Sequence, residues 1–277
     1  MDKIKSLKEV IQTIDNNQTI ALGGNVLHRA PMSMVREIVR QKRKNLKIVK
    51  TAGAHDVDTL ARGKCVQSVD AGFVSYETEY GLATYYGKAV ENGEVKANEH
   101  ACYTVMSALN AAKTNAPFMP VYGLQISDLI DANDYFARIR DPFSGEEITV
   151  VKAIVPDVAL IHVHACDEQG NAIIEGPLFD DVLLSRAAKR VIITTEKIIS
   201  TAQVKIKNNQ VAIPGFLVES VTVIPKGAAP CSCPNVYDVD HKVLKDFLNN
   251  EETSYLEQYL KTYETIDYMS ERRTMRW

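Results

Sequence analysis

Two adjacent glycines at the end of an apolar run are the first residues of this sequence whose types and spacing suggest chemistry. The apolar residues 20–22 lead into Gly23, Gly24 and Asn25, and Pro31 opens a helical stretch shortly afterwards. Glycines allow a tight turn and let backbone N–H groups approach a ligand, whereas proline at the first helical position loses no needed donor. The segment has neither the third glycine of a dinucleotide fingerprint nor the Lys-Ser/Thr of a phosphate loop. It suits a turn that binds a polar group, although spacing alone favours a plain reversal of the chain.

Three further side chains could take part in binding or catalysis. Arg29, in the loop after the glycines, offers a fork of donors to a carboxylate or phosphate, or else is a solvated loop residue. Ser75 follows a predicted strand, which places it at the ligand edge of a sheet or on an ordinary surface loop. Glu99 follows Asn98, which suits a helix N-cap. A carboxylate in that first turn could act as a base or be a plain helix residue.

Histidines and cysteines occur in two short pairs that raise the question of a metal. His162 and His164 alternate on one face of a predicted strand, and Cys231 and Cys233 stand in a proline-flanked loop. A zinc site needs further ligands at suitable spacing, and the sequence offers neither pair a compelling set. We therefore predict no metal, hydrogen-bonded histidines and reduced thiols. The two aspartates at 180–181 are interpreted as the start and cap of a helix.

Helix and strand periods alternate along the chain and must position these residues. Helical patterns occur at Lys5–Ile14 and Pro31–Lys42. Strand patterns occur at Thr19–Leu22, Leu46–Lys50, Val66–Asp70, Ala153–Val155, Val158–His164, Val191–Thr195 and Val218–Ile224. This succession predicts an α/β fold with an open, mostly parallel sheet flanked by helices, whose ligands bind at the carboxyl ends of the strands. No linker, low-complexity tract or repeat divides the chain, so we predict a single domain over 1–277 with a long surface excursion at about 123–150.

Composition argues against several classes of function. The 277 residues include 32 Lys and Arg and 35 Asp and Glu, a net charge of −3, and the bases are spread along the chain. This distribution argues against nucleic-acid binding. No apolar run reaches the roughly 20 residues of a membrane span, and the charged N-terminus is unlike a secretory signal. Five cysteines do not make the even disulfide framework of a small secreted domain. We predict a cytoplasmic protein with free thiols and no membrane association.

Several segments together resemble the A (alpha) subunits of family I coenzyme A transferases. Asn16–Gly24, with Pro31 seven residues later, is similar to their N-terminal signature, from which Asn25 and Arg29 depart. Arginine two residues before this proline resembles the glutaconate CoA-transferase branch and the related ring-cleaving CoA hydrolase subunits. Similar segments then follow in the same order: Ala71–Ser75, Gly81–Ala83, Glu99 before an alanine-rich helix, Ala116–Pro120, Pro156–His162, Ala187–Ile193 and Glu196–Ile199.

The resemblance implies an active site shared by two chains. It implies the NagB/RpiA/CoA transferase-like fold, a homologous B (beta) subunit in an A2B2 heterotetramer, and a glutamate nucleophile in that partner that carries CoA as a glutamyl thioester. This chain would help to move CoA between short carboxylic or dicarboxylic acids. An acyl-CoA thioester is then a substrate, and no cofactor is bound permanently. The substrate-binding residues would be Gly23, Gly24, Asn25, Arg29 and Ser75.

The same resemblance leaves two alternatives. In the similar ring-cleaving hydrolases, an A-subunit glutamate in this region is implicated in catalysis, which implies a catalytic role for Glu99. The chain would then belong to a CoA-thioester hydrolase, or to an enzyme that cleaves a C–C bond of an acyl-CoA or decarboxylates it. The other alternative is a non-catalytic acyl-CoA-binding protein that keeps the fold. The partner's sequence separates the transferase from the hydrolase or C–C-cleaving alternative, because a transferase requires a glutamate at the nucleophile position.

Overall fold

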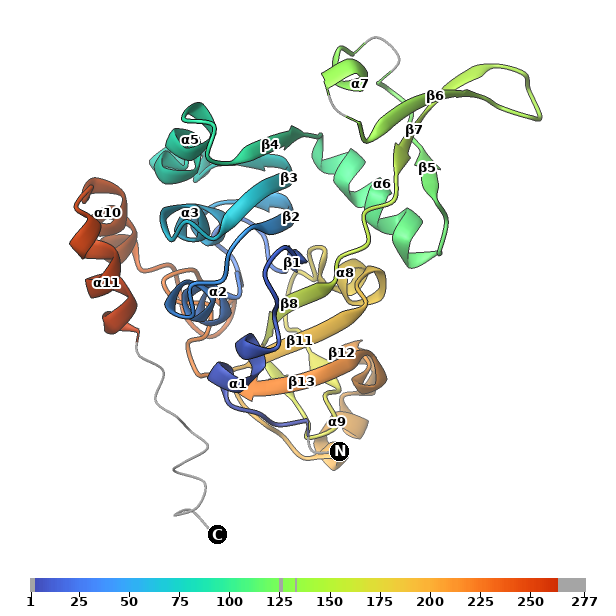
Figure 1. Cartoon of the computed structure of the whole chain (residues 1–277). Coiled ribbons are helices and arrows are strands. Elements are labelled where there is room, and N and C mark those ends of the chain that lie inside the picture. Colours follow the sequence, from blue (N-terminus) through green and yellow to red (C-terminus); the bar gives the residue numbers. More distant parts are fainter. Residues whose placement is uncertain (1–2, 125–126, 133, 264–277) are drawn as a thin grey trace, which may run out of the picture.

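Runs of β-branched and aliphatic residues form a seven-stranded sheet at the centre of the protein (Figure 1). The structure is a computed structural model that describes residues 3–124, 127–132 and 134–263. The strand order is β13-β11-β8-β1-β2-β3-β4, and all neighbours are parallel. The strands are β1 (Thr19–Leu22), β2 (Leu46–Gly53), β3 (Val66–Val74), β4 (Lys96–Glu99), β8 (Val158–Val163), β11 (Arg190–Thr195) and β13 (Val218–Val223). Every residue of β8 is buried, as expected for a strand covered on both faces.

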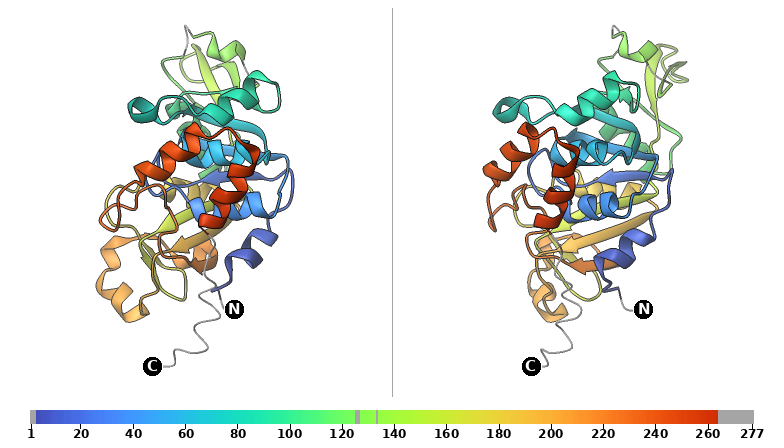
Figure 2. Two further views of the ribbon diagram at one scale, coloured as in Figure 1. Left: turned by 90° about the vertical axis from the view of Figure 1, so that its left-hand side faces the viewer. Right: turned by 60° about the vertical axis from the view of Figure 1, so that its left-hand side comes forward.

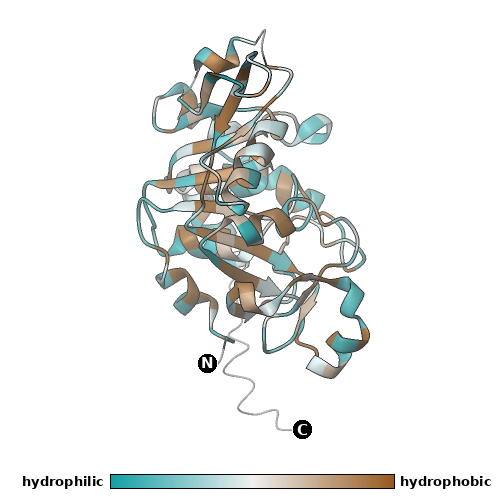
Figure 3. Cartoon of the chain, turned by 90° about the vertical axis from the view of Figure 1, so that its right-hand side faces the viewer, coloured by the Kyte–Doolittle hydropathy of each residue, from teal (hydrophilic) through white to brown (hydrophobic). Residues whose placement is uncertain are grey.

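Helices cover both faces of this sheet. One layer contains α1 (Leu7–Gln12), α2 (Met32–Arg40), α3 (His55–Arg62) and α5 (Thr84–Glu91). The opposite layer contains α6 (Cys102–Lys113) and α8 (Asp181–Ala187). Each layer encloses its own apolar core against the sheet. Figure 3 shows the central strands as mostly hydrophobic and the outer turns as largely hydrophilic, the pattern of burial that drives this layering.

The last two helices, α10 (His241–Asn249) and α11 (Thr253–Thr262), pack beside α3 (Figure 2). The ring of His55, the first residue of α3, lies 4.6 Å from that of Phe247 and 5.6 Å from that of Tyr259. The remaining helical segments are α4 (Glu77–Tyr80), α7 (Leu129–Ala132), α9 (Thr201–Ile206), η1 (Asn208–Gln210) and η2 (Gly215–Leu217). Within the described residues, none of these helices combines the length and apolar character needed to cross a bilayer.

Two small antiparallel sheets accompany the central one. The first has the order β5-β7-β6 and projects beside α6 (Figure 1). Its strands are β5 (Phe118–Pro120), β6 (Phe136–Arg140) and β7 (Glu147–Lys152), and the second sheet consists of β9 (Ala165–Cys166), β10 (Ala172–Ile173) and β12 (Val211–Ile213). The hairpin of β6 and β7 takes up residues 136–150 of the segment expected to be a surface excursion, so strand pairing organises this part of it. That the chain is a single domain stays a prediction.

The predicted α/β architecture with a parallel sheet is confirmed, and the strands of the central sheet differ from the prediction in two places. Ala153–Val155 is not the strand that its apolar pattern predicts. It connects β7 to β8, and the Ala153 and Ile154 N–H groups bond to carbonyls outside the central sheet. Strand β4 has no counterpart among the predicted strands. Its sequence, Lys-Ala-Asn-Glu, is short and polar, which is common for a strand at the edge of a sheet.

Candidate functional site

The carboxyl ends of four neighbouring strands bring several of the predicted residues to one edge of the sheet. Gly23 follows the end of β1, Ser75 follows β3, and Glu99 ends β4. Because β1, β2, β3 and β4 are adjacent and parallel, these residues share the edge at which open α/β sheets bind ligands.

Glu99 is on a strand, not in the first turn of a helix as predicted. It pairs in register with Ala71 of β3, and its side chain is exposed. Asn98 does not cap a helix, because its side-chain amide donates to Asp70 at 3.0 Å within the sheet. Helix α6 begins at Cys102 instead. Pairing with the free edge of β3 therefore prevails over the local capping preference of asparagine, and it leaves Glu99 at the carboxyl end of the outermost strand.

The glycine turn is closed by bonds within the chain. The Gly23 N–H donates to Leu160 at 2.9 Å, and the Gly24 N–H donates to the Asp181 carboxylate at 2.8 Å. Gly24 has φ +71°, and a Cβ there would lie 2.5 Å from the backbone of Arg29. Both amides are thus engaged internally, and both glycines are required by close packing. Contact of this turn with a substrate stays a prediction.

Arg29 is not a solvated loop residue. Its guanidinium is fully buried, 2.6 Å from Asp181, and donates to the carbonyls of His162 at 3.1 Å and Pro177 at 2.8 Å. The ring of Phe179 lies beneath it at 5.3 Å. A buried arginine paired with a buried aspartate is costly to desolvate and is stable only when its donors are satisfied. Arg29 therefore anchors the loop before α2, and binding of a substrate carboxylate by it stays a prediction.

Lys50 is a second buried cation under the same loop, with a role that sequence reasoning missed. From β2 its ammonium donates to the carbonyls of Gly23 and Gly24 and lies 3.2 Å from Asp56. The glycine turn is therefore held from both sides, with its carbonyls on Lys50 and one amide on Asp181. A lysine within an apolar strand is the signal that could have found it, because such a residue is seldom buried without a partner.

The prediction that the Asp180 side chain caps α8 is wrong. Its side chain makes no capping bond and instead contacts the Thr51 hydroxyl, at the carboxyl end of β2. Burial raises the pKa of Asp180; Lys50 opposes this shift and Asp181 adds to it. Cys102, nearby at the start of α6, bonds weakly to the Thr51 carbonyl at 3.4 Å. Burial also raises the pKa of this thiol, so Cys102 is a poor nucleophile.

Asn25 and Ser75 stabilise tight turns at this edge. Asn25 and His28 exchange backbone hydrogen bonds of 2.9 and 2.8 Å across the loop after the glycines. The Ser75 hydroxyl donates to Gly81 at 2.9 Å and accepts from the Glu77 N–H at 2.9 Å. Both side chains are partly exposed, so substrate binding by Asn25 and Ser75 stays a prediction.

Both histidines of the pair are hydrogen-bonded, as predicted. His162 bonds to Thr194 at 2.9 Å and to Glu196 at 2.7 Å, while His164 bonds to the Pro234 carbonyl at 2.8 Å and accepts from the Glu175 N–H at 3.1 Å. All five cysteines are free thiols, which confirms that prediction.

The structure nevertheless brings possible metal ligands together that the sequence keeps apart. His162, Glu196 and Cys233 place their ligand atoms within 4.8 Å of one another. Burial opposes ionisation of Glu196, but hydrogen bonds from His162, Lys226 and Tyr237 outweigh it and leave its pKa below the usual value. Burial also raises the pKa of Cys233 to about 12, which disfavours the thiolate that a metal needs. That the site holds no metal stays a prediction.

Most of the chain matches a known protein family. Residues 4–223 match the family model described as "Coenzyme A transferase". The chain is 35% identical over 266 residues to an uncharacterised protein of Archaeoglobus fulgidus, covering 94% of this chain but only 59% of that protein. It is 30% identical to the A chain of the glutaconate CoA-transferase of Acidaminococcus fermentans, covering 88% and 82%. It is 28% identical to the IpdA subunit of the cholesterol ring-cleaving hydrolase of Rhodococcus jostii, covering 95% and 92%.

Two solved structures share the whole architecture. The crystal structure of glutaconate coenzyme A-transferase from Acidaminococcus fermentans has a TM-score of 0.89 at 28% identity, covering 94% of this chain and 88% of that chain. The decarboxylase AibA/AibB has a TM-score of 0.86 at 30% identity, covering 95% and 98%. The similar proteins therefore include a transferase, a hydrolase and a decarboxylase on one fold.

Proposed function

Because the chain belongs to the coenzyme A transferase family and has an A-subunit-like fold, we propose that it is the A subunit of a heteromeric CoA transferase. The enzyme would move CoA between short carboxylic or dicarboxylic acids. A homologous B subunit would complete the active site at the carboxyl edge of the sheet.

The observation that carries the proposal is the chemistry of that edge. It presents the exposed carboxylate of Glu99, whereas the Ser75 hydroxyl and the Cys102 thiol near it are not activated. The Ser75 hydroxyl donates to a backbone carbonyl, and the pKa of Cys102 is raised by burial. Activation of either residue would require a neighbouring base or a lowered pKa. A nucleophile supplied by a second chain fits such an edge.

The proposed reaction proceeds in two half-reactions at the partner's glutamate. The glutamate oxygen attacks the acyl-CoA carbonyl and releases CoA thiolate, which leaves an acyl glutamyl anhydride. The thiolate then attacks the glutamyl carbonyl and releases the first acid as its carboxylate. The second acid reverses both steps and leaves with CoA, so no oxidant or permanently bound cofactor is consumed.

This chain would shape the acyl pocket. The glycine turn with Asn25, together with Ser75, would border the acyl group, and Glu99 would lie at its outer side. Arg29 would act through Asp181 by fixing the turn in place. Lys50 would fix the same turn through its carbonyls. A rigid turn matters because misplacing a substrate by about 1 Å can cost about 100-fold in rate.

Trapping the covalent intermediate tests this function. The chain is co-expressed with its B subunit, and the purified complex is treated with an acyl-CoA and borohydride, with a sample lacking acyl-CoA as control. Mass spectrometry should find a reduced glutamyl residue in the B subunit of the treated sample alone. Acyl-CoA binding without such a residue would contradict the transferase mechanism.

The second candidate is an acyl-CoA hydrolase, C–C-cleaving enzyme or decarboxylase that uses Glu99. The exposed position of Glu99 at the end of β4 favours it, because a carboxylate there could activate water or accept a substrate proton. Glu99→Gln should then abolish hydrolysis, C–C cleavage or decarboxylation, while the matched variant Glu94→Gln, at another exposed acid just before β4, should not. A transferase would keep most of its rate in both variants. Acyl-CoA binding without any turnover would instead indicate the non-catalytic binding protein.

The assembly and the location belong to the same proposal. We propose an A2B2 heterotetramer in the cytoplasm. Relatives whose names describe them as A subunits support a partner B subunit. Light scattering of the co-purified chains should give the mass of two A and two B subunits. A stable monomer of this chain in the presence of its partner would contradict it.

A further inference from the structure

A cavity of about 370 Å³ lies away from the carboxyl ends of the central strands. It is lined by the amino-terminal parts of β2 and β3, by β4, and by the end of β7 with the two residues before β6. The lining residues are Lys47, Gln67, Ser68, Lys96, Asn98, Asp134, Tyr135 and Lys152. Its volume lies within the range of about 300–1,000 Å³ that is usual for small-molecule sites.

Strand register brings three of the lining residues together. Lys47 pairs with Ser68, and Ser68 pairs with Lys96, so the three lie side by side across three strands. Side chains at paired positions of a parallel sheet point to the same face. Lys152, the last residue of β7, joins them from the small sheet. Three cations from separate parts of the sequence therefore meet in one cavity.

The three lysines make no close ion pair among the described residues, although Asp157 lies within electrostatic range of Lys47. Within the described part of the chain, none of the ammonium groups of Lys47, Lys96 and Lys152 makes a hydrogen bond or an ion pair within 4.0 Å. The single acidic residue of the lining is Asp134, which is exposed. The lining residues thus have a net charge of +2, from three lysines and one aspartate, while the buried Asp70 carboxylate lies behind Asn98. Like charges gathered in a concave site repel one another and concentrate anions from solution.

The wall of the cavity also contains an unpaired polar atom. Asn98 is 7% exposed, and its side-chain nitrogen donates to Asp70 at 3.0 Å. Its carbonyl oxygen has no hydrogen-bond partner among the described residues. This oxygen is closed off from solvent, so a molecule in the cavity does not reach it.

The cavity is separate from the candidate active site. Lys96 lies three residues before Glu99 on β4, a distance of about 10 Å along a strand. The odd spacing directs the two side chains to opposite faces of the sheet. A phosphate held above Lys96 therefore does not contact the Glu99 carboxylate.

We propose that this cavity is a binding site for a phosphate-bearing small molecule. A phosphate monoester carries a charge of about −1.5 to −2 at neutral pH, which balances the lining, and lysines bind phosphate as point charges. The phosphate belongs either to the nucleotide head of coenzyme A or to a free phosphorylated metabolite, since both present the same group. The proposal does not depend on which reaction the enzyme catalyses.

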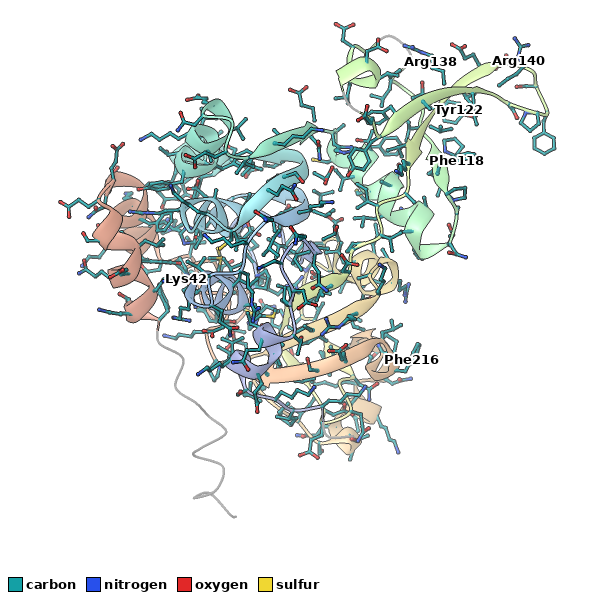
Figure 4. The ribbon with its side chains drawn as sticks, viewed as in Figure 1. Lys42, Phe118, Tyr122, Arg138, Arg140 and Phe216 are labelled. Atoms are coloured by element: carbon teal, nitrogen blue, oxygen red, sulfur yellow. The ribbon has the colours of Figure 1, made fainter. Side chains whose placement is uncertain are left out.

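Isothermal titration calorimetry of the full-length chain, purified with its partner, tests the proposal. The probes are adenosine 3′,5′-bisphosphate, inorganic pyrophosphate and uncharged adenosine. The test variant combines Lys47→Gln, Lys96→Gln and Lys152→Gln. The control combines Lys42→Gln, Lys205→Gln and Lys245→Gln, three exposed lysines outside the cavity. Lys42 lies beyond α2, far from the small sheet (Figure 4). Both variants lose the same charge, and circular dichroism verifies their folding.

A charged probe should bind saturably to the wild type, and the cavity variant should weaken it about tenfold or more, equivalent to about 1.4 kcal/mol. The control variant should bind like the wild type, and arginine at all three cavity positions should restore binding. Stronger binding of adenosine 3′,5′-bisphosphate than of pyrophosphate would assign the cavity to the nucleotide head of coenzyme A. Equal binding of the two probes would assign it to a free phosphorylated metabolite. No saturable binding, or equal weakening by both variants, would overturn the proposal.

Discussion

The loop after β1 and the ends of β3 and β4 lie at the same edge of the sheet, yet they use their charges in opposite ways. Around the first, Arg29, Lys50, Asp56 and Asp181 are buried and bonded to one another or to the backbone. At the second, Glu99 is exposed. A charged residue at the ligand-binding edge of the sheet can therefore either hold the backbone in place or take part in binding and catalysis. Burial and partners distinguish the two, whereas residue type does not.

Arg29→Met should have the largest effect on stability. It leaves Asp181 as an unpaired buried carboxylate and removes two bonds to backbone carbonyls. Breaking one side of a buried ion pair costs about 3–5 kcal/mol, and urea unfolding followed by circular dichroism measures it. The double variant Arg29→Met, Asp181→Leu should recover part of this loss. A loss below about 1 kcal/mol would mean that the Arg29–Asp181 pair stabilises the protein no more than an exposed ion pair does.

Gly24→Ala should have the next largest effect. The residue would need φ +71°, and its Cβ would lie 2.5 Å from backbone atoms of Arg29 and His28. Strain and overpacking together should cost about 3 kcal/mol in the same unfolding measurement. Gly93→Ala is the matched control, because Gly93, in the turn after α5, has the same φ of +71° with no atom within 4 Å of its Cβ. It should cost only about 1–2 kcal/mol, and equal costs would show that crowding does not constrain the loop after β1.

The loop after β3 has its own buried anchor, which should respond to pH. Tyr76 donates to Asp58 at 3.0 Å and contacts His55 at 2.9 Å. Burial raises the pKa of Asp58 to about 6 and lowers that of His55 to about 3. The stability linked to Asp58 is lost as pH rises from 3.8 to about 6, whereas that linked to His55 is lost as pH falls below 6.5. The two contributions oppose each other between about pH 4 and 6.

Asp58→Asn should remove the contribution of Asp58 and leave the opposing contribution of His55 uncompensated. The free energy of unfolding should then fall by about 1.4 kcal/mol for each pH unit between about pH 6 and 4, more steeply than in the wild type. Melting temperatures measured across this range test the slope, with Asp246→Asn, at an exposed acid of α10, as control. Parallel curves for wild type and Asp58→Asn would contradict the opposed pair.

Glu99→Gln should have the smallest effect on stability. The side chain is exposed at the end of an edge strand, and surface substitutions usually change the free energy of unfolding by less than about 0.5 kcal/mol. Thermal unfolding of this variant should match that of Glu94→Gln. A loss comparable to that of Arg29→Met would mean that Glu99 belongs to the scaffold, and the contrast between the two regions would fail.

Much of the fold follows from local patterns. Strand β1 has the predicted bounds Thr19–Leu22, and the predicted strands beginning at Leu46, Val66, Val158 and Val218 begin there in the structure. These strands are apolar because a parallel sheet covered on both faces buries them. Strand β4 could not be found in this way. Its four residues, three of them polar, become a strand only because β3 offers unpaired backbone groups beside them.

The candidate site is less predictable, for a related reason. The sequence indicates Arg29 as a donor near a ligand edge, but not that Asp181 occupies it. It suggests a cap at Asp180, where the structure has a contact with Thr51. It does not single out the lysines at 47, 96 and 152, since they are far apart in the chain and meet only through strand register.

The sequence by itself determined the strand and helix periods, the order of elements and the family resemblance, because these depend on neighbouring residues and their spacing. The tertiary structure alone decided which charged side chains are buried and paired and which are exposed. Pairing depends on residues more than a hundred positions apart, such as Arg29 and Asp181, brought within 2.6 Å. The energy of a charge depends on its solvation and its partners, and both are set only when the sheet and its loops have assembled.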